Sequence, residues 1–163
     1  MSSIRAVVIT VSDACSRGER EDTSGAALVQ LLTELGAEIV ETKILSDDLD
    51  PLVQVLIAYA QRDDVNLIIT TGGTGLGPRD NTPEATQQVI EREAPGIAEA
   101  IRVESLKATP MAMLSRAVCG VRAGTLIINV PGSPKAVRES FAVVAPILRH
   151  AIDLLAGRTK HDK

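Results

Sequence analysis

The segment from Thr71 to Asp80 has the composition of an anion-binding loop. It holds four glycines within six residues, Gly72, Gly73, Gly75 and Gly77, so side chains leave many backbone N–H groups uncovered. Such groups can converge on a phosphate, and the positive end of a following helix adds to the attraction. Arg79 and Asp80 add a cation and a carboxylate to the loop. This pattern indicates phosphate chemistry assisted by a divalent metal, whereas the alternative is a tight turn that needs positive φ.

A second candidate phosphate site is the segment Asn129-Val130-Pro131-Gly132-Ser133-Pro134-Lys135. Ser133 has the residue type of a helix cap, and Pro134 suits the first helical position. Lys135 would then lie in the first turn, where the helix dipole disfavours a cation unless it meets an anion. The alternative is an ordinary capped helix with a solvated lysine. Two anion sites in one cleft would suit a substrate with two phosphoryl groups.

Aspartates supply the candidate metal ligands. Asp80 adjoins the glycine loop, and Asp13, Asp47 and Asp48 follow two strand-like segments. Two converging carboxylates could hold Mg²⁺, which prefers oxygen ligands and keeps several waters. We expect Asp80 and Asp47 to be the pair. Taken singly, an aspartate is more often a loop or capping residue, and this reading fits Asp48 and Asp50 best.

Composition excludes several function classes. The chain has 163 residues, of which 45% are hydrophobic and 1% aromatic, and its net charge is -4. Scarce aromatic side chains and the lack of a basic block argue against nucleic-acid binding. No apolar run approaches the roughly 20 residues that span a bilayer, and the N-terminus lacks a signal-peptide pattern. Cys15 and Cys119 are far apart, which suits a reducing cytoplasm.

The elements that must position these residues alternate along the chain. Hydrophobic runs predict strands over 4–11, 38–45, 65–70, 117–122 and 125–130. Caps and periodicity predict helices over 23–35, 50–61, 82–93, 97–106 and 133–155, with Pro146 kinking or splitting the last, and 108–116 is compatible with a short helix. This order predicts a single domain over 1–163, a three-layer α/β/α sandwich with a largely parallel sheet. The polar motifs all follow strands, so they should gather at the carboxyl edge, where such sheets bind ligands.

The motifs TTGGTG, GPRD-x-TPEAT, PGIAEAIR, LSRA and N-x-PGSPK, taken together, resemble those of the molybdopterin adenylyltransferase family of molybdenum cofactor biosynthesis. The resemblance covers essentially the whole chain. It implies the molybdopterin-binding-domain fold and a homotrimer or doubled trimer. It also implies a reaction in which molybdopterin and ATP give adenylyl-molybdopterin and pyrophosphate, with Mg²⁺. A non-catalytic molybdopterin-binding, carrier or scaffold module of the same fold is the alternative, and hand-over to a molybdenum-inserting enzyme is a further implied contact.

The resemblance also assigns roles to residues. It implies that Asp47 and Asp80 are catalytic and hold the metal. Asp22-Thr23-Ser24-Gly25 is closer to a second, less well defined bacterial branch of the family, whereas Asp80 favours activity. The implied substrate-binding positions are Ser12, Asp13, Thr71, Gly72, Gly73, Thr74, Gly75, Ser115, Pro131, Gly132, Ser133 and Lys135.

Overall fold

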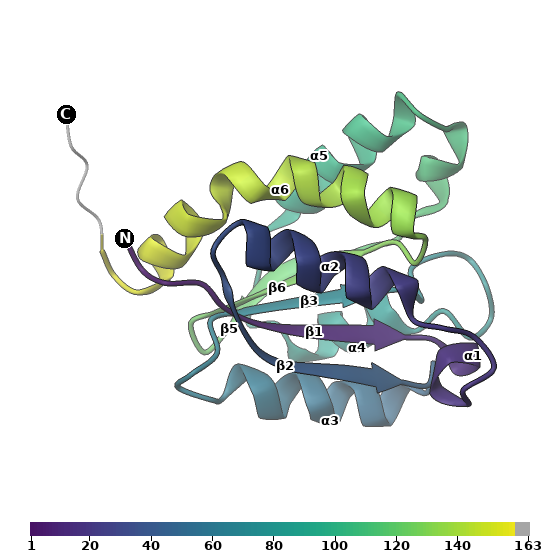
Figure 1. Ribbon diagram of the computed structural model, residues 1–163, viewed down its shortest axis with the longest axis horizontal. Coiled ribbons are helices and arrows are strands. Elements are labelled where there is room, and N and C mark those ends of the chain that lie inside the picture. The colour runs from purple at the N-terminus through teal and green to yellow at the C-terminus, as the bar shows by residue number, and fades with distance from the viewer. Residues whose placement is uncertain (159–163) are drawn as a thin grey trace.

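A computed structural model describes residues 1–158 of the chain, in which a central sheet is covered by helices on both faces (Figure 1). The sheet has six strands in the order β2-β1-β3-β6-β5-β4. The first four strands in this order are parallel, and β5 and β4 continue the sheet in antiparallel pairing. The strands are β1 (Arg5–Val11), β2 (Glu38–Leu45), β3 (Leu67–Thr71), β4 (Arg92–Glu93), β5 (Cys119–Arg122) and β6 (Thr125–Val130).

The helices form the two outer layers of the sandwich. Figure 1 shows α2, α5 and α6 on one face of the sheet, with α3 and α4 on the other. A short 3₁₀ helix follows α5, and the small helix α1 follows β1. The bounds are α1 (Asp13–Ser16), α2 (Thr23–Glu34), α3 (Leu49–Ala60), α4 (Thr82–Val89), α5 (Pro95–Leu106), the 3₁₀ helix (Pro110–Leu114) and α6 (Pro134–Leu155). The predicted three-layer fold and largely parallel sheet are confirmed.

The hydrophobic core has two parts, one on each face of the sheet, because successive side chains of the central strands point to opposite faces. Val8 and Ile69 pack with buried residues of α2, α5 and α6, whereas Ile9 and Ile68 pack with buried residues of α3 and α4. Successive strand residues point to opposite faces, so a strand covered on both sides needs apolar residues throughout. The near-continuous run of β1 therefore fixes its central place between the two helical layers.

The predicted helix over 82–93 was wrong at its end, because α4 stops at Val89. The chain then turns into β4, where the Glu91 N–H donates to the Val121 carbonyl at 2.8 Å and the Ala94 N–H to the Cys119 carbonyl at 2.8 Å. Pairing with β5 thus outweighs the helical preference of these residues.

Pro146 does not split α6, which is continuous from Pro134 to Leu155. Both Pro146 and Ala142 are exposed, so the carbonyl that proline leaves without a helical partner can bond to water. Between residues 1 and 158, no helix has both the length and the apolar character to cross a membrane. The end of the expected 1–163 domain, with its charged tail and His161, lies outside the described residues.

Candidate active site at the carboxyl ends of the strands

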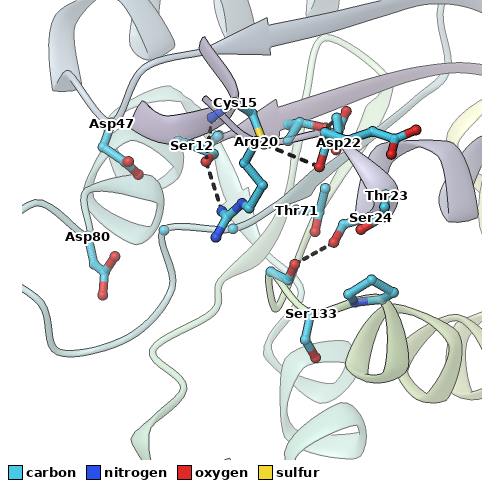
Figure 2. A pocket seen from close by; sticks show the side chains of 17 residues that line it. Ser12, Cys15, Arg20, Asp22, Thr23, Ser24, Asp47, Thr71, Asp80 and Ser133 are labelled. Atoms are coloured by element: carbon cyan, nitrogen blue, oxygen red, sulfur yellow. Dashed lines mark hydrogen bonds between the residues drawn. The ribbon is translucent and has the colours of Figure 1, made fainter. Parts of the chain in front are cut away.

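A cavity of about 500 Å³ opens where β1 and β3 end. Four loops contribute to it, following β1, β2, β3 and β6, as open parallel sheets favour. Figure 2 shows residues of these loops around one hollow. Of the residues predicted from the sequence, those that line it are Ser12, Asp47, Thr71, Gly72, Gly73, Asp80, Gly132 and Ser133.

The glycine loop and the loop after β6 pack directly against each other. Thr71 Oγ1 donates to the Pro131 carbonyl at 2.7 Å, and the Gly72 N–H donates to the Val130 carbonyl at 3.2 Å. Gly72 has φ +98°, and a Cβ atom there would lie 2.3 Å from the Val11 carbonyl oxygen. Only glycine permits this approach to the end of β1. The two hydrogen bonds join the candidate phosphate loops into one surface.

Backbone donors line this surface. Within residues 1–158, the N–H groups of Gly73, Gly132 and Ser133 have no hydrogen-bond acceptor. Ser133 caps α6 by accepting from the Ala136 N–H at 3.1 Å, which places the positive end of that helix at the cavity. Free N–H groups beside a helix N-terminus attract anions, so the cavity can receive a phosphate group.

Asp47 and Asp80 lie at the same end of the cavity (Figure 2). Asp47 Oδ2 accepts from the Asp13 N–H at 2.9 Å, and Asp80 Oδ2 accepts from the Gly77 N–H at 2.9 Å. Burial raises the pKa of Asp47, the Asp13 N–H opposes this, and the charges of Asp13 and Asp80 add to the rise. The second oxygen of each carboxylate has no hydrogen-bond donor within the described chain.

This pair fits Mg²⁺ by its chemistry. Both residues offer carboxylate oxygens, the donors that Mg²⁺ prefers, and Mg²⁺ is commonly bound by one or two carboxylates together with water and substrate phosphates. The part of the chain that the structure describes contains no group of three or more His, Cys, Asp and Glu residues that could enclose a metal. A metal at Asp47 and Asp80 would therefore take further ligands from substrate and water.

Asp13 and Arg79 do not line the cavity, but their ion pair helps to connect the loops that form its rim. Arg79 forms ion pairs with Asp13 at 2.6 Å and with Asp48 at 3.0 Å. The Arg79 guanidinium, with the Asp47 N–H, holds the pKa of Asp13 at about 2. The Ser46 hydroxyl and then Arg79 lower the pKa of Asp48. These bonds connect the loops after β1, β2 and β3, so the Asp13 side chain braces the site.

The remaining predicted residues do not line the cavity, namely Asp13, Thr74, Gly75, Ser115, Pro131 and Lys135. The Lys135 side chain is 79% exposed, and its Nζ lies 3.9 Å from Glu139 Oε1. The Ser115 hydroxyl accepts from the Ala117 N–H at 3.4 Å. Their proposed contacts with substrate stay predictions.

Several lining residues come from the segment between the end of β1 and the first turn of α2, and the sequence did not identify them as site residues. Asp22 accepts from Thr10 Oγ1 at 2.7 Å and caps α2 through the Gly25 N–H at 2.8 Å. The Ser24 hydroxyl donates to the Gly132 carbonyl, which joins α2 to the second phosphate loop. Their position in the sequence could have identified these residues, because this stretch also follows the carboxyl end of a strand, β1. The lining residues in question are Cys15, Arg20, Glu21, Asp22, Thr23 and Ser24.

Arg116 stabilises the glycine loop through hydrogen bonds from its guanidinium to the backbone of the loop. Its Nε donates to the Gly75 carbonyl at 2.7 Å and its Nη2 to the Asp80 carbonyl at 2.7 Å, while Nη1 pairs with Glu84. The Arg116 backbone N–H also donates to the Thr74 carbonyl at 2.8 Å. The planar guanidinium thus fixes both ends of the segment that carries Asp80.

Known proteins share this architecture. Residues 7–150 match the family model described as "Probable molybdopterin binding domain". A Helicobacter pylori (strain ATCC 700392 / 26695) protein named molybdopterin adenylyltransferase is 40% identical over 159 residues, which cover 96% of this chain and 90% of the relative. The Drosophila melanogaster molybdenum cofactor synthesis protein cinnamon is 45% identical over 156 residues, or 95% of this chain, but the chain spans only 26% of its length.

A solved structure agrees with the sequence relatives. The molybdopterin biosynthesis enzyme MoaB of Thermus thermophilus is 47% identical, with a TM-score of 0.89 over 94% of this chain and 97% of the other. Fold and sequence therefore agree, and the family model covers most of the chain. The chain belongs to the molybdopterin-binding-domain family of molybdenum cofactor biosynthesis proteins.

Proposed function

We propose that the chain is a molybdopterin adenylyltransferase that transfers AMP from Mg²⁺-bound ATP to the terminal phosphate of molybdopterin. The observation that carries the proposal is the meeting of Gly73, Ser133, Asp47 and Asp80 at one cavity. Two amide-lined loops suit two phosphoryl groups, and a carboxylate pair suits a metal that accompanies them. The name of the Helicobacter pylori relative agrees with this activity.

In the proposed reaction, a phosphate oxygen of molybdopterin attacks the α-phosphorus of ATP in line. A new phosphorus–oxygen bond forms, the bond to the bridging oxygen breaks, and its electron pair leaves with pyrophosphate. The nucleophile is already an anion, so no side chain must remove a proton from it. Catalysis then consists of positioning and charge stabilisation, so the reaction needs no histidine, and none lines the cavity among residues 1–158.

Each part of the cavity has a task in this scheme. The N–H of Gly73 stabilises an equatorial phosphoryl oxygen, and the N–H groups of Gly132 and Ser133 hold a second phosphate group. Asp47 and Asp80 would hold Mg²⁺, which when bound neutralises charge on the departing pyrophosphate. We include Mg²⁺, ATP and molybdopterin in the proposal on this basis.

The direct test is to incubate the purified chain with ATP, Mg²⁺ and molybdopterin and to measure pyrophosphate. We expect pyrophosphate and adenylyl-molybdopterin in equal amounts, and neither when molybdopterin is omitted. Tight molybdopterin binding with no pyrophosphate would instead identify a non-catalytic carrier or scaffold module.

Arg116 should act as a positioning residue in this reaction. Arg116→Lys keeps the charge but loses the guanidinium fork, so we expect kcat to fall about tenfold or more with little change in the KM for molybdopterin. Steady-state kinetics on a variant shown by thermal unfolding to be folded would measure this split.

Arg149→Lys is the matched control for Arg116. Arg149 is a half-buried arginine of α6 whose Nη2 donates to the Leu35 carbonyl at 2.6 Å, and it does not line the cavity. Equal loss of kcat in both variants would mean that Arg116 contributes only to general stability.

We also propose that the chain acts in the cytoplasm as a homotrimer or a doubled trimer and hands its product to a molybdenum-inserting enzyme. Exposed apolar side chains on and after α5, Val103, Met111 and Met113, offer a surface for subunit contact. Light scattering of the purified chain would give the number of subunits.

A further inference from the structure

Arg20 is the one lysine or arginine that lines the cavity among the residues that the structure describes. It lies in the loop between α1 and α2, and Figure 2 shows its side chain reaching from this loop toward the hollow between Asp80 and Ser24. The other charged residues of the lining are acidic: Glu21, Asp22, Asp47 and Asp80. Any polyphosphate in this cavity would therefore meet Arg20 as its only side-chain cation from the described chain.

The nearby cations are occupied elsewhere. Arg79 is paired with Asp13 and Asp48, and Lys135 lies outside the cavity near Glu139. Arg17 belongs to the same loop as Arg20, but it is paired with Glu19 at 2.9 Å and does not line the cavity. A mutation of Arg20 therefore has no neighbour of like charge to compensate for it in this cavity.

The Arg20 guanidinium is anchored at one end and free at the other. Its Nη2 donates to Ser12 Oγ at 3.1 Å, and Ser12 is only 8% exposed. Within residues 1–158, Nε and Nη1 of Arg20 have no acceptor. The hydroxyl of Ser12 is itself fixed, because it accepts from the Cys15 N–H at 3.2 Å. A planar fork with free donors suits bidentate contact with a phosphate group.

We propose that Arg20 binds the β- and γ-phosphates of ATP, and hence the pyrophosphate product, with Ser12 holding the guanidinium in place. This inference rests on the proposed function for its substrate, and it replaces Lys135 with Arg20 as the phosphate-binding cation of the site. Arg20 would also shield the incoming polyphosphate from the acidic side chains around it.

Calorimetric titration without molybdopterin tests this assignment. Pyrophosphate, ATP and AMP are titrated, each with Mg²⁺, into the full chain and into Arg20→Met and Arg20→Lys. We expect Arg20→Met to weaken pyrophosphate and ATP binding about tenfold or more, which is the scale of a charged hydrogen bond. AMP binding should change little, and Arg20→Lys should fall between, because lysine keeps the charge without the fork. Thermal unfolding would confirm that each variant is folded.

Arg17→Met is the matched control, since it removes the same charge from the same loop. Unchanged pyrophosphate binding in Arg20→Met would overturn the assignment, as would an equal loss in Arg17→Met or no pyrophosphate binding by the unaltered chain. A chain that binds pyrophosphate through Arg20 but never adenylylates molybdopterin would refute the proposed function and leave the Arg20 site standing.

Discussion

Asp80→Asn is expected to lower the rate of adenylyl-molybdopterin formation about a thousandfold while leaving the fold and molybdopterin binding intact. The substitution keeps the size of the side chain but removes one of the two carboxylates at the end of the cavity. Loss of a metal-binding charge costs several kcal/mol of transition-state stabilisation, or about three powers of ten in rate. Single-turnover measurement of pyrophosphate would test the expected loss of rate, and a separate measurement of molybdopterin binding would test whether binding is retained.

Asp50→Asn is the control for Asp80. Asp50 is an exposed aspartate in the first turn of α3 and does not line the cavity. It should keep the adenylylation rate of the unaltered chain. If Asp80→Asn also kept that rate, Asp80 would have no place in the mechanism.

Gly72→Ala should destabilise the folded chain by about 3 kcal/mol and abolish phosphate binding. The φ of +98° disfavours alanine, and the added Cβ would lie 2.3 Å from the Val11 carbonyl oxygen, which is backbone and cannot rotate away. Relief of this clash must separate the glycine loop from β1. Urea unfolding would measure the change in the free energy of unfolding. Titration with pyrophosphate would measure phosphate binding at the site.

Gly124→Ala separates the cost of backbone conformation from that of the clash. Gly124 has φ +79°, but no atom lies within 4 Å of its added Cβ. We expect a loss of about 1–2 kcal/mol there, with pyrophosphate binding retained. Equal losses at both glycines would show that the close approach to Val11 is unimportant.

The sequence was most informative where local pattern and position coincide. The apolar run of β1 and the capped start of α6 were predicted, because burial on two faces and the Ser133-Pro134 pair leave few alternatives. Open parallel sheets bind ligands at the carboxyl ends of their strands, and this rule predicted that Gly73, Ser133 and Asp80 lie near one another.

Features that depend on tertiary contacts were not predictable in the same way. α4 ends early because residues 90–94 form backbone hydrogen bonds with β5, and no local sequence feature at Glu91 predicts this pairing. Lys135 was expected at a phosphate from its place in the sequence, yet its side chain extends from α6 toward Glu139. Arg20 lies in a polar loop, and its direction depends on Ser12, eight residues earlier in the chain.

Asp13 and Asp47 each accept a hydrogen bond from the backbone N–H of the other, at 3.0 and 2.9 Å, yet their pKa values shift in opposite directions. The raised pKa of Asp47 means that this side chain takes up its proton first as the pH falls, whereas Asp13 stays ionised until pH reaches about 2. The Arg79 brace on the rim therefore outlasts the negative charge at Asp47. At a pH that protonates Asp47 but not Asp13, the proposed adenylylation should fall while the loops of the rim stay joined, and a return to neutral pH should restore it without refolding.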